Sequence, residues 1–238
     1  MRNEYFQFKS FRIEQQHAAM KVTTDGCVFG ALVAKNLPGA HKVLDIGTGT
    51  GLLSLMYAQL NPKAEILALE IEESTASEAH QNVLNSPWKD QIIIEHQDVK
   101  SFQASQLFNL IIVNPPFFER SMKSDAKAKN LAIHDDSLPK QTLAKKLSEL
   151  LDEKGTAAVM YPLAEMHIFK EEALPLGLQC NQSIILFDKA SVEALRAICF
   201  FTKSNQVGDQ TAQFIIKDEH GQYTPEFTDL LKPYYLYL

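Results

Sequence analysis

Cysteine, tryptophan and long apolar runs are all scarce in this chain of 238 residues, which has three cysteines and one tryptophan. Cys27, Cys180 and Cys199 are odd in number, far apart and outside any CxxC pair. This pattern excludes a disulfide framework and argues against a zinc site, so we expect reduced thiols, no metal and a cytoplasmic location. We expect neither a membrane helix, which needs roughly 18 apolar residues, nor a secretory signal, because the N-terminus lacks an apolar region.

The composition is that of a folded globular protein, with 45% hydrophobic and 22% charged residues. The net charge of −6 by itself disfavours a nucleic-acid partner. Residues 1–24 and 120–146, however, carry an excess of Lys and Arg, and the remainder of the chain is acidic. Two basic segments on an acidic body are compatible either with solvated loops or with a polyanionic partner.

Apolar segments of strand length alternate with helical segments along most of the chain. We expect strands at 42–46, 66–71, 91–96, 109–113 and 156–161, and helices at 23–37, 51–60, 73–84 and after Pro139, the last one ending at Gly155. Alternation of this kind predicts βαβ units and a parallel sheet with helices on both faces.

The last quarter of the chain has a different pattern. Strands are expected at 183–187, 197–203 and 213–217, and the last two predict an antiparallel hairpin with residues 205–210 as its loop. A final short helix is expected to begin at Thr224-Pro225. We therefore predict one α/β domain over 1–238, in which 1–40 form an N-terminal flanking segment and 41–238 the catalytic core.

A glycine-rich turn follows the first expected strand, with glycine at every second position: Gly47, Gly49 and Gly51. Glycine permits positive φ and close approach of a ligand, and this turn lies at the carboxyl ends of the strands, where ligands bind in open α/β sheets. A dinucleotide fingerprint is excluded because Leu52 stands in its third glycine position, and no GK[ST] follows for a Walker loop.

The D-x-G-x-G-x-G pattern of residues 45–51 resembles class I S-adenosylmethionine-dependent methyltransferases. The resemblance implies a Rossmann-like class I methyltransferase fold with a mostly parallel seven-stranded sheet and the antiparallel C-terminal hairpin. It places the methionine part of the cofactor over the glycine turn, ribose hydroxyls on Glu70, and the adenine amino group on Asp98. The cofactor-binding residues implied in this part of the chain are Asp45, Gly47, Thr48, Gly49, Gly51, Glu70, Ile71 and Asp98.

A second motif, Asn114-Pro115-Pro116-Phe117, directly follows the strand expected at 109–113. It resembles the [N/D]-P-P-[Y/F] signature of methyltransferases that act on planar nitrogens. The amine of adenine is a poor nucleophile because its lone pair is delocalised, so acceptors at Asn114 and Pro115 would orient it and stabilise developing charge. Phe117 would stack on the target base, which must be extruded from its own stack.

The length of the chain narrows the range of possible substrate classes. Methyltransferases of glutamine side chains share the tetrapeptide but carry an N-terminal helical domain, whereas only residues 1–40 precede the expected core here. The recognition domain typical of DNA adenine methyltransferases is also missing. A catalytic domain with basic flanks favours RNA, whose fold presents unstacked bases.

Both ends of the chain resemble the bacterial tRNA(Val) adenine-N6 methyltransferase family, through Lys21-Val22-x-Thr24-Asp25-Gly26 and Tyr223-Thr224-x-Glu226-Phe227. The resemblance implies N6-methylation of adenosine 37, with Lys21, Thr24 and Asp25 lining the cofactor pocket beside Asn114. Phe117 replaces the more usual Tyr and also occurs in ribosomal-RNA relatives. A ribosomal-RNA adenine-N6 methyltransferase, a protein-glutamine N5-methyltransferase and a non-catalytic binding module remain as alternatives.

The basic residues near these motifs are candidates for contacts with RNA phosphates, which would make binding sensitive to salt. They are Lys9, Arg12, Arg120, Lys123, Lys127 and Lys129. We expect a monomer that binds tRNA and neither a membrane nor a metal.

Overall fold

The computed structural model describes residues 4–18, 20–115, 138–203 and 210–238. The N-terminal part contains β1 (Tyr5–Gln7), β2 (Arg12–Glu14), α1 (Thr24–Asn36), β3 (Lys42–Ile46), α2 (Leu52–Leu60), β4 (Glu65–Glu70), α3 (Glu73–Leu84), β5 (Ile92–His96) and β6 (Phe108–Val113). The C-terminal part contains α5 (Lys140–Leu150), β7 (Leu151–Tyr161), α6 (Leu163–Ala173), β8 (Gln179–Lys189), β9 (Ala194–Thr202), β10 (Gln210–Lys217) and α7 (Pro225–Leu231). Among these described residues, none of the helices has the length and apolar character of a membrane span.

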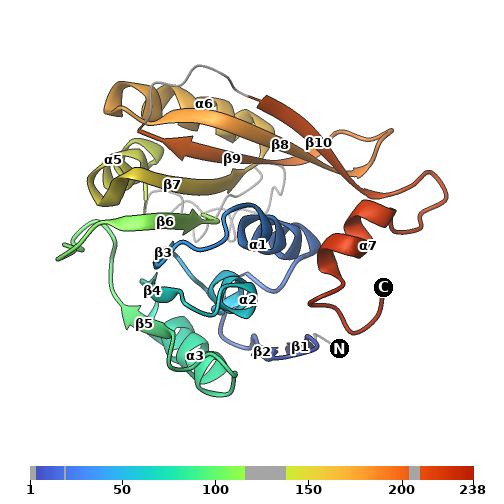
Figure 1. The fold of residues 1–238 in the computed structure, drawn as a ribbon, viewed down its shortest axis with the longest axis horizontal. Coiled ribbons are helices and arrows are strands. Elements are labelled where there is room, and N and C mark those ends of the chain that lie inside the picture. The colour runs from blue at the N-terminus through green and yellow to red at the C-terminus, as the bar shows by residue number, and fades with distance from the viewer. Residues whose placement is uncertain (1–3, 19, 116–137, 204–209) are drawn as a thin grey trace, which may run out of the picture.

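The main sheet has eight strands in the order β10-β8-β9-β7-β6-β3-β4-β5 (Figure 1). Strand β9 runs antiparallel to both of its neighbours, and the other neighbouring strands are parallel. The predicted mostly parallel sheet with antiparallel strands near the C-terminus is confirmed, although it has eight strands rather than seven. The organisation into one domain with a flanking segment at 1–40 stays a prediction.

The predicted hairpin between the last two strands is wrong. Strand β9 pairs on one side with β7 and on the other with β8, so neither side is open to β10. Strand β10 instead pairs in parallel with the outer side of β8. The antiparallel hairpin of this region is β8–β9.

Helices cover both faces of the sheet (Figure 1), as predicted. Successive residues of β6 point to opposite faces, because side chains alternate along a strand. Leu110 and Ile112 belong to the core cluster that includes residues of α1, α2 and α7, and Ile111 and Val113 belong to the cluster that includes residues of α5 and α6. The buried strand β6 thus joins two apolar layers.

Helix α1 is the central helix of one layer. Thr23 caps its N-terminus by accepting a hydrogen bond from the Gly26 amide at 3.2 Å. Its residues from Gly26 to Ala34 are all buried, so the helix is enclosed on every side. A Cβ at Gly30 would lie 2.9 Å from the Met56 sulfur, which shows how closely α1 and α2 approach.

The two ends of the chain meet beside this layer (Figure 1). Phe8 forms an isolated antiparallel bridge with Tyr235, and the Lys9 amide donates to the Tyr234 carbonyl at 2.8 Å. The buried Tyr234 hydroxyl donates to the Met56 carbonyl in α2 at 3.0 Å. The terminal segments are therefore part of the packed structure.

The parallel register aligns the carboxyl ends of four strands. Ile46 of β3 lies opposite Leu69 of β4 and Val113 of β6, and Glu70 of β4 lies opposite His96 of β5. The segments that follow these strands consequently begin at one edge of the sheet, where the predicted site residues are found.

Gly155 does not end a helix as predicted, because α5 stops at Leu150 and β7 begins at once. Gly155 lies at an irregularity of β7, where the pairing shifts between Phe108 and Leu110 of β6. A Cβ at Gly155 would lie 2.9 Å from the Phe108 carbonyl oxygen, so this position admits no side chain without movement of the backbone.

We predict that Gly155→Ala lowers the free energy of unfolding by about 1–3 kcal/mol, because the added methyl group overpacks the β6–β7 contact. Urea denaturation checks this, with Lys154→Ala on the same strand as the exposed control, expected within about 0.5 kcal/mol of the unaltered protein. Equal stability of the two variants would contradict the close approach of β7 to β6.

Candidate functional site

The glycine turn between β3 and α2 adopts the left-handed conformation at each of its glycines. The φ angles are +68° at Gly47, +57° at Gly49 and +82° at Gly51. The amides of Gly47 and Thr48 donate to the Leu69 carbonyl at 2.9 and 3.0 Å, which fixes the turn to the end of β4. A Cβ at Gly47 or Gly49 would meet no heavy atom within 4 Å, so the turn leaves an open cradle.

Asp45 lies beneath this turn and is completely buried. Its Oδ2 accepts hydrogen bonds from the hydroxyls of Thr48 and Ser54, each at 2.7 Å. Its Oδ1 is buried without a partner in the part of the chain that the structure describes. Burial raises the pKa of Asp45 from 3.8 to about 6, the two hydroxyls oppose the shift, and the charge of Glu70 adds to it. A cationic group would supply both a hydrogen-bond donor for Oδ1 and a positive charge to balance the carboxylate.

Glu70 connects the end of β4 to the glycine turn. One carboxylate oxygen accepts from the amides of Ile71 and Glu72 at 2.9 and 3.0 Å, and the other accepts from the Gly49 amide at 2.9 Å. A carboxylate has about four acceptor positions, so this one retains capacity for a further donor. Ile71, the next residue, exposes 45% of its surface.

Asp98 follows β5 at the same edge of the sheet, where the Gln97 amide donates to the Glu70 carbonyl at 2.9 Å. The Asp98 carboxylate accepts from the Lys100 amide at 2.8 Å and forms an ion pair with the Lys100 ammonium at 3.4 Å. Its side chain is partly exposed. The predicted acidic residues at or near the carboxyl ends of β3, β4 and β5 are thus brought to one edge.

Asn114 and Pro115 follow β6 next to the glycine turn. The Asn114 Oδ1 is buried and has no hydrogen-bond partner among the described residues. Asn114 lines a pocket together with residues of the glycine turn and of the N-terminal segment. The other residues that line it are Met20, Lys21, Val22, Thr23, Gly26, Gly47, Thr48, Gly49, Thr50, Leu52 and Leu53.

The donor and acceptor groups of this pocket fit S-adenosylmethionine. The open cradle at Gly47 and Gly49 admits a ligand against the backbone. The Asp45 Oδ1 lies beneath the turn, behind the residues that line the pocket, and as an unpartnered acceptor it suits an ammonium group. The unpartnered Asn114 Oδ1 suits a second amine. Polar atoms buried without partners are rare and call for an explanation, which ligand binding provides here.

The three predicted residues of the N-terminal flank occupy different places. Lys21 lines the pocket, and Thr24 is exposed at the start of α1. The Asp25 carboxylate pairs with the Arg196 Nε of β9 at 3.0 Å, and both side chains are largely buried. The sequence carries no signal for this ion pair, because its members are distant in the chain and meet only through the fold.

Of the residues predicted to act on the base or on RNA, Pro116, Phe117, Arg120, Lys123, Lys127 and Lys129 lie outside the described residues. Lys9 and Arg12 are described, and each has a partner within the protein. The Lys9 ammonium donates to the Lys232 carbonyl at 2.6 Å. The Arg12 guanidinium pairs with Glu14 at 2.7 Å and lies 3.7 Å from the Tyr5 ring centroid. Their contact with RNA stays a prediction.

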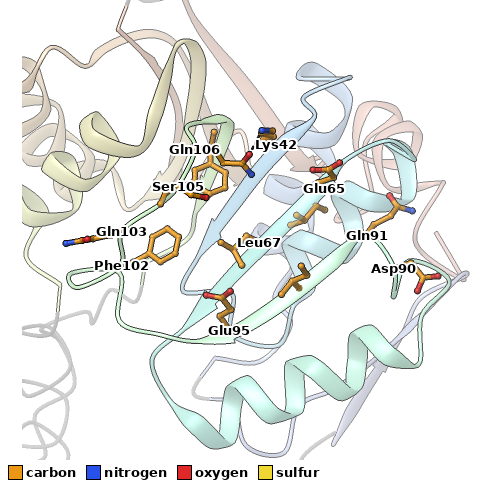
Figure 2. Close-up of a pocket in the computed structure, with 14 residues that line it drawn as sticks. Lys42, Glu65, Leu67, Asp90, Gln91, Glu95, Phe102, Gln103, Ser105 and Gln106 are labelled. Carbon is orange, nitrogen blue, oxygen red and sulfur yellow. Dashed lines mark hydrogen bonds between the residues drawn. The ribbon is translucent and has the colours of Figure 1, made fainter.

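A larger pocket of about 550 Å³ lies elsewhere on the sheet (Figure 2). Its lining runs from Lys42, Glu65 and Gln91, at or just before the first residues of β3, β4 and β5, along the sheet to Leu67 and Glu95, and it includes no residue of the glycine turn. Residues 97–107, all of which the structure describes, connect β5 to β6 without a helix, so part of this face stays uncovered. We place the functional site at the smaller pocket.

The raised pKa of Asp45 predicts a pH-dependent contribution to stability. The folded state binds this proton more tightly than the unfolded state, so the cost of burying the charge is absent below about pH 4 and complete above about pH 6. Asp45→Asn removes the charge and keeps an acceptor for the hydroxyls. We therefore expect the variant to gain roughly 2–3 kcal/mol relative to the unaltered protein between pH 4 and pH 7.

Urea titrations of both proteins at several pH values check this prediction. The difference between the two proteins isolates Asp45 from the other carboxyl groups, which titrate alike in both. Parallel stability curves across this range would contradict a charged, buried Asp45.

Comparison with known proteins identifies the fold and the family of this chain. The family profile described as methyltransferase small domain matches residues 28–137. In solved structures, a predicted O-methyltransferase of Agrobacterium tumefaciens superposes with a TM-score of 0.66 at 17% identity, covering 87% of this chain and 95% of that one. A TehB-like SAM-dependent methyltransferase of Corynebacterium glutamicum gives a TM-score of 0.51 at 16% identity, covering 74% of this chain and 88% of that one. These structures establish the class I methyltransferase fold.

Two curated relatives extend the comparison to the full length of the chain. The tRNA1(Val) (adenine(37)-N6)-methyltransferase of Bacteroides thetaiotaomicron is 37% identical over 239 residues, covering 100% of both chains. The enzyme of the same name from Trichodesmium erythraeum is 37% identical over 240 residues, covering 99% of both. These matches span the terminal segments as well as the glycine turn and Asn114-Pro115. The chain therefore belongs to the tRNA1(Val) (adenine(37)-N6)-methyltransferase family.

Proposed function

We propose that this chain transfers the methyl group of S-adenosylmethionine to N6 of adenine 37 in tRNA(Val). The observation that carries the proposal is the shared pocket of the glycine turn and Asn114, whose Oδ1 is buried without a partner among the described residues. The relatives that match the whole chain act on this adenine by name, which supplies the substrate.

Different residues of the site bind different parts of the cofactor. Gly47, Thr48, Gly49 and Gly51 hold its methionine part, and Asp45 accepts from its ammonium group. Glu70 uses its remaining acceptor capacity for ribose hydroxyls, and Ile71 and Asp98 border the adenine. When bound, S-adenosylmethionine supplies a methyl group that its positively charged sulfur makes electrophilic. Lys21 closes the pocket from the N-terminal side, and Thr24 and Asp25 stand between the lining residues Thr23 and Gly26 without lining the pocket themselves.

Asn114 and Pro115 act on the adenine amine. Their carbonyl oxygens accept the two N–H groups, so that the nitrogen lone pair faces the methyl group and the developing positive charge is stabilised. An N6–C bond forms as the S–C bond breaks, and one N6 proton leaves to water. Pro115 has no amide hydrogen to donate, and we propose that Phe117 stacks on the extruded base.

The tRNA partner is held by the basic residues at 120–129, with Lys9 and Arg12 as further contacts. A non-catalytic binding module would not need both the glycine turn and the Asn114-Pro115-Pro116-Phe117 motif. Glutamine N5-methylation and ribosomal-RNA methylation use the same kind of acceptor but have no support among the full-length relatives described above. We propose that the enzyme acts as a monomer in the cytoplasm.

We predict that Asn114→Ala lowers the rate of methyl transfer to an unmodified tRNA(Val) transcript by at least about 100-fold, because a preorganised group that stabilises transition-state charge is lost. Cofactor affinity, measured by calorimetry, is expected to stay close to that of the unaltered protein. Asn114→Asp keeps an acceptor at the same place and is expected to retain more activity than the alanine variant. Near-full turnover by Asn114→Ala would overturn the assigned mechanism.

We predict that replacing Lys123, Lys127 and Lys129 together by Gln weakens tRNA binding and reduces the slope of log affinity against log salt by roughly 2–3, because each phosphate contact contributes about 0.7–0.9 to it. A salt titration checks this, with exposed Lys63, Lys89 and Lys154 replaced as the matched control. An unchanged slope in the first variant would place the path of the RNA elsewhere.

A further inference from the structure

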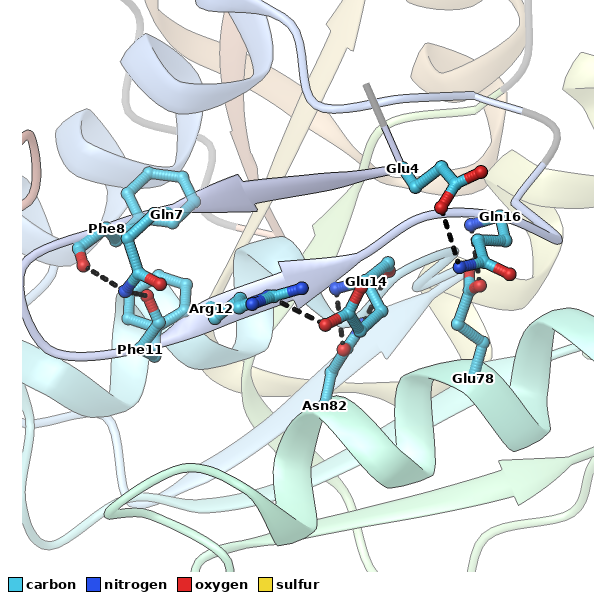
Figure 3. Close-up of polar contacts among 9 residues, drawn as sticks. All are labelled: Glu4, Gln7, Phe8, Phe11, Arg12, Glu14, Gln16, Glu78 and Asn82. Carbon is cyan, nitrogen blue, oxygen red and sulfur yellow. Dashed lines mark hydrogen bonds and ion pairs between the residues drawn. The ribbon is translucent and has the colours of Figure 1, made fainter. Parts of the chain in front are cut away.

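One face of α3 is polar and yet buried. Thr75, Glu78 and Asn82 expose only 4%, 8% and 2% of their surfaces. Their spacing of three and four residues places them on the same side of the helix. Buried polar groups need partners, and these three find them in the N-terminal segment, residues 4–18 and 20–23, which crosses this face (Figure 3).

Glu78 binds three consecutive main-chain amides of the N-terminal segment. One carboxylate oxygen accepts from Gln16 at 2.7 Å and His17 at 3.0 Å, and the other accepts from Ala18 at 3.2 Å. The Thr75 hydroxyl donates to the His17 carbonyl at 3.3 Å. Hydrogen bonds to an ionised carboxylate are about twice as strong as neutral ones, so Glu78 is the principal anchor of this stretch.

Asn82 connects the N-terminal segment to the glycine turn. Its Oδ1 accepts from the Glu14 amide at 2.8 Å, and its Nδ2 donates to the Glu14 carbonyl at 2.9 Å, in the manner of a neighbouring strand (Figure 3). The same Nδ2 donates to the Thr50 carbonyl at 3.0 Å. One buried side chain therefore fixes both the segment and the turn.

The N-terminal segment then returns to form a wall of the cofactor pocket. The buried Gln15 accepts a hydrogen bond from the Val22 amide at 2.8 Å, which ties the two ends of this stretch together. Met20, Lys21, Val22 and Thr23 line the pocket together with the glycine turn. The anchored residues 16–18 lie within the stretch that Gln15 closes, so their position determines where this wall lies.

We propose that Glu78 and Asn82 are positioning residues that hold the N-terminal segment as a wall of the cofactor pocket and thereby set the affinity for S-adenosylmethionine. The inference rests on the proposed function, because it takes that cofactor as the ligand. When these hydrogen bonds are lost, the segment forms the pocket wall in only a fraction of the molecules. The apparent affinity for the cofactor then falls in proportion to that fraction. The base-binding residue Asn114 follows β6 and is not held by this anchor.

The test is Glu78→Gln, which keeps the shape of the side chain and removes its charge. Calorimetry with S-adenosylmethionine is expected to show a dissociation constant raised roughly tenfold. Amide exchange at Gln16, His17 and Ala18 is expected to accelerate, whereas kcat at saturating cofactor stays unchanged. Glu171→Gln, an exposed residue of α6, is the matched control and is expected to match the unaltered protein in all three.

Unchanged affinity in a Glu78→Gln protein whose 16–18 amides exchange faster would overturn the inference, because the anchor would be lost without effect on the pocket. A fall of kcat at saturating cofactor as large as the loss of cofactor affinity would also overturn the inference. If Glu78→Gln does not fold, Gln15→Met takes its place, because it removes the acceptor of the Val22 amide. The same two results, for cofactor affinity and for kcat, would then overturn the inference. Failure of the unaltered protein to bind S-adenosylmethionine would instead refute the proposed function.

Discussion

The parallel register of β3, β4, β5 and β6 is the constraint on which the site depends. It aligns the ends of these strands, so that the glycine turn, Glu70, Asp98 and Asn114 meet at one edge although they are far apart in the chain. A slip of one residue in any pair would move side chains to the other face of the sheet. The buried apolar residues on both faces of β6 oppose such a slip.

Buried polar groups are the second feature that shapes the site and its walls. Asp45 and Asn114 each keep an oxygen without a partner among the described residues, and burial raises the pKa of Asp45. Glu78 and Asn82, by contrast, have their buried oxygens bonded to main-chain amides of the N-terminal segment. Unpartnered atoms point to ligands, and partnered ones explain how the walls around those ligands are held. The site thus combines unpartnered hydrogen-bond acceptors with surrounding segments that hydrogen bonds hold in place.

Local patterns predicted much of this arrangement. The periodicity of residues 23–37, 51–60 and 73–84 is confirmed as α1, α2 and α3, and Thr224 caps α7 as expected. The alternate glycines predicted a turn, and each is left-handed. These features succeed because they depend on neighbouring residues alone.

Features that depend on distant partners could not be read in this way. The pairing of β10 with β8 follows from β9 being paired on both sides. Glu78 and Asn82 have the polarity of a solvated helix face, and nothing local indicates that the N-terminal segment covers them. The Asp25–Arg196 ion pair has the same origin.

Transfer of labelled methyl from S-adenosylmethionine into a mixture of unmodified tRNA, ribosomal RNA and protein extract tests the central claim most directly. Mass spectrometry of the products then identifies the methylated group. The account predicts N6-methyladenosine at position 37 of tRNA(Val). Label found as methylglutamine in protein, or in ribosomal RNA alone, would contradict the substrate, and absence of label from all three would contradict the assignment of the pocket.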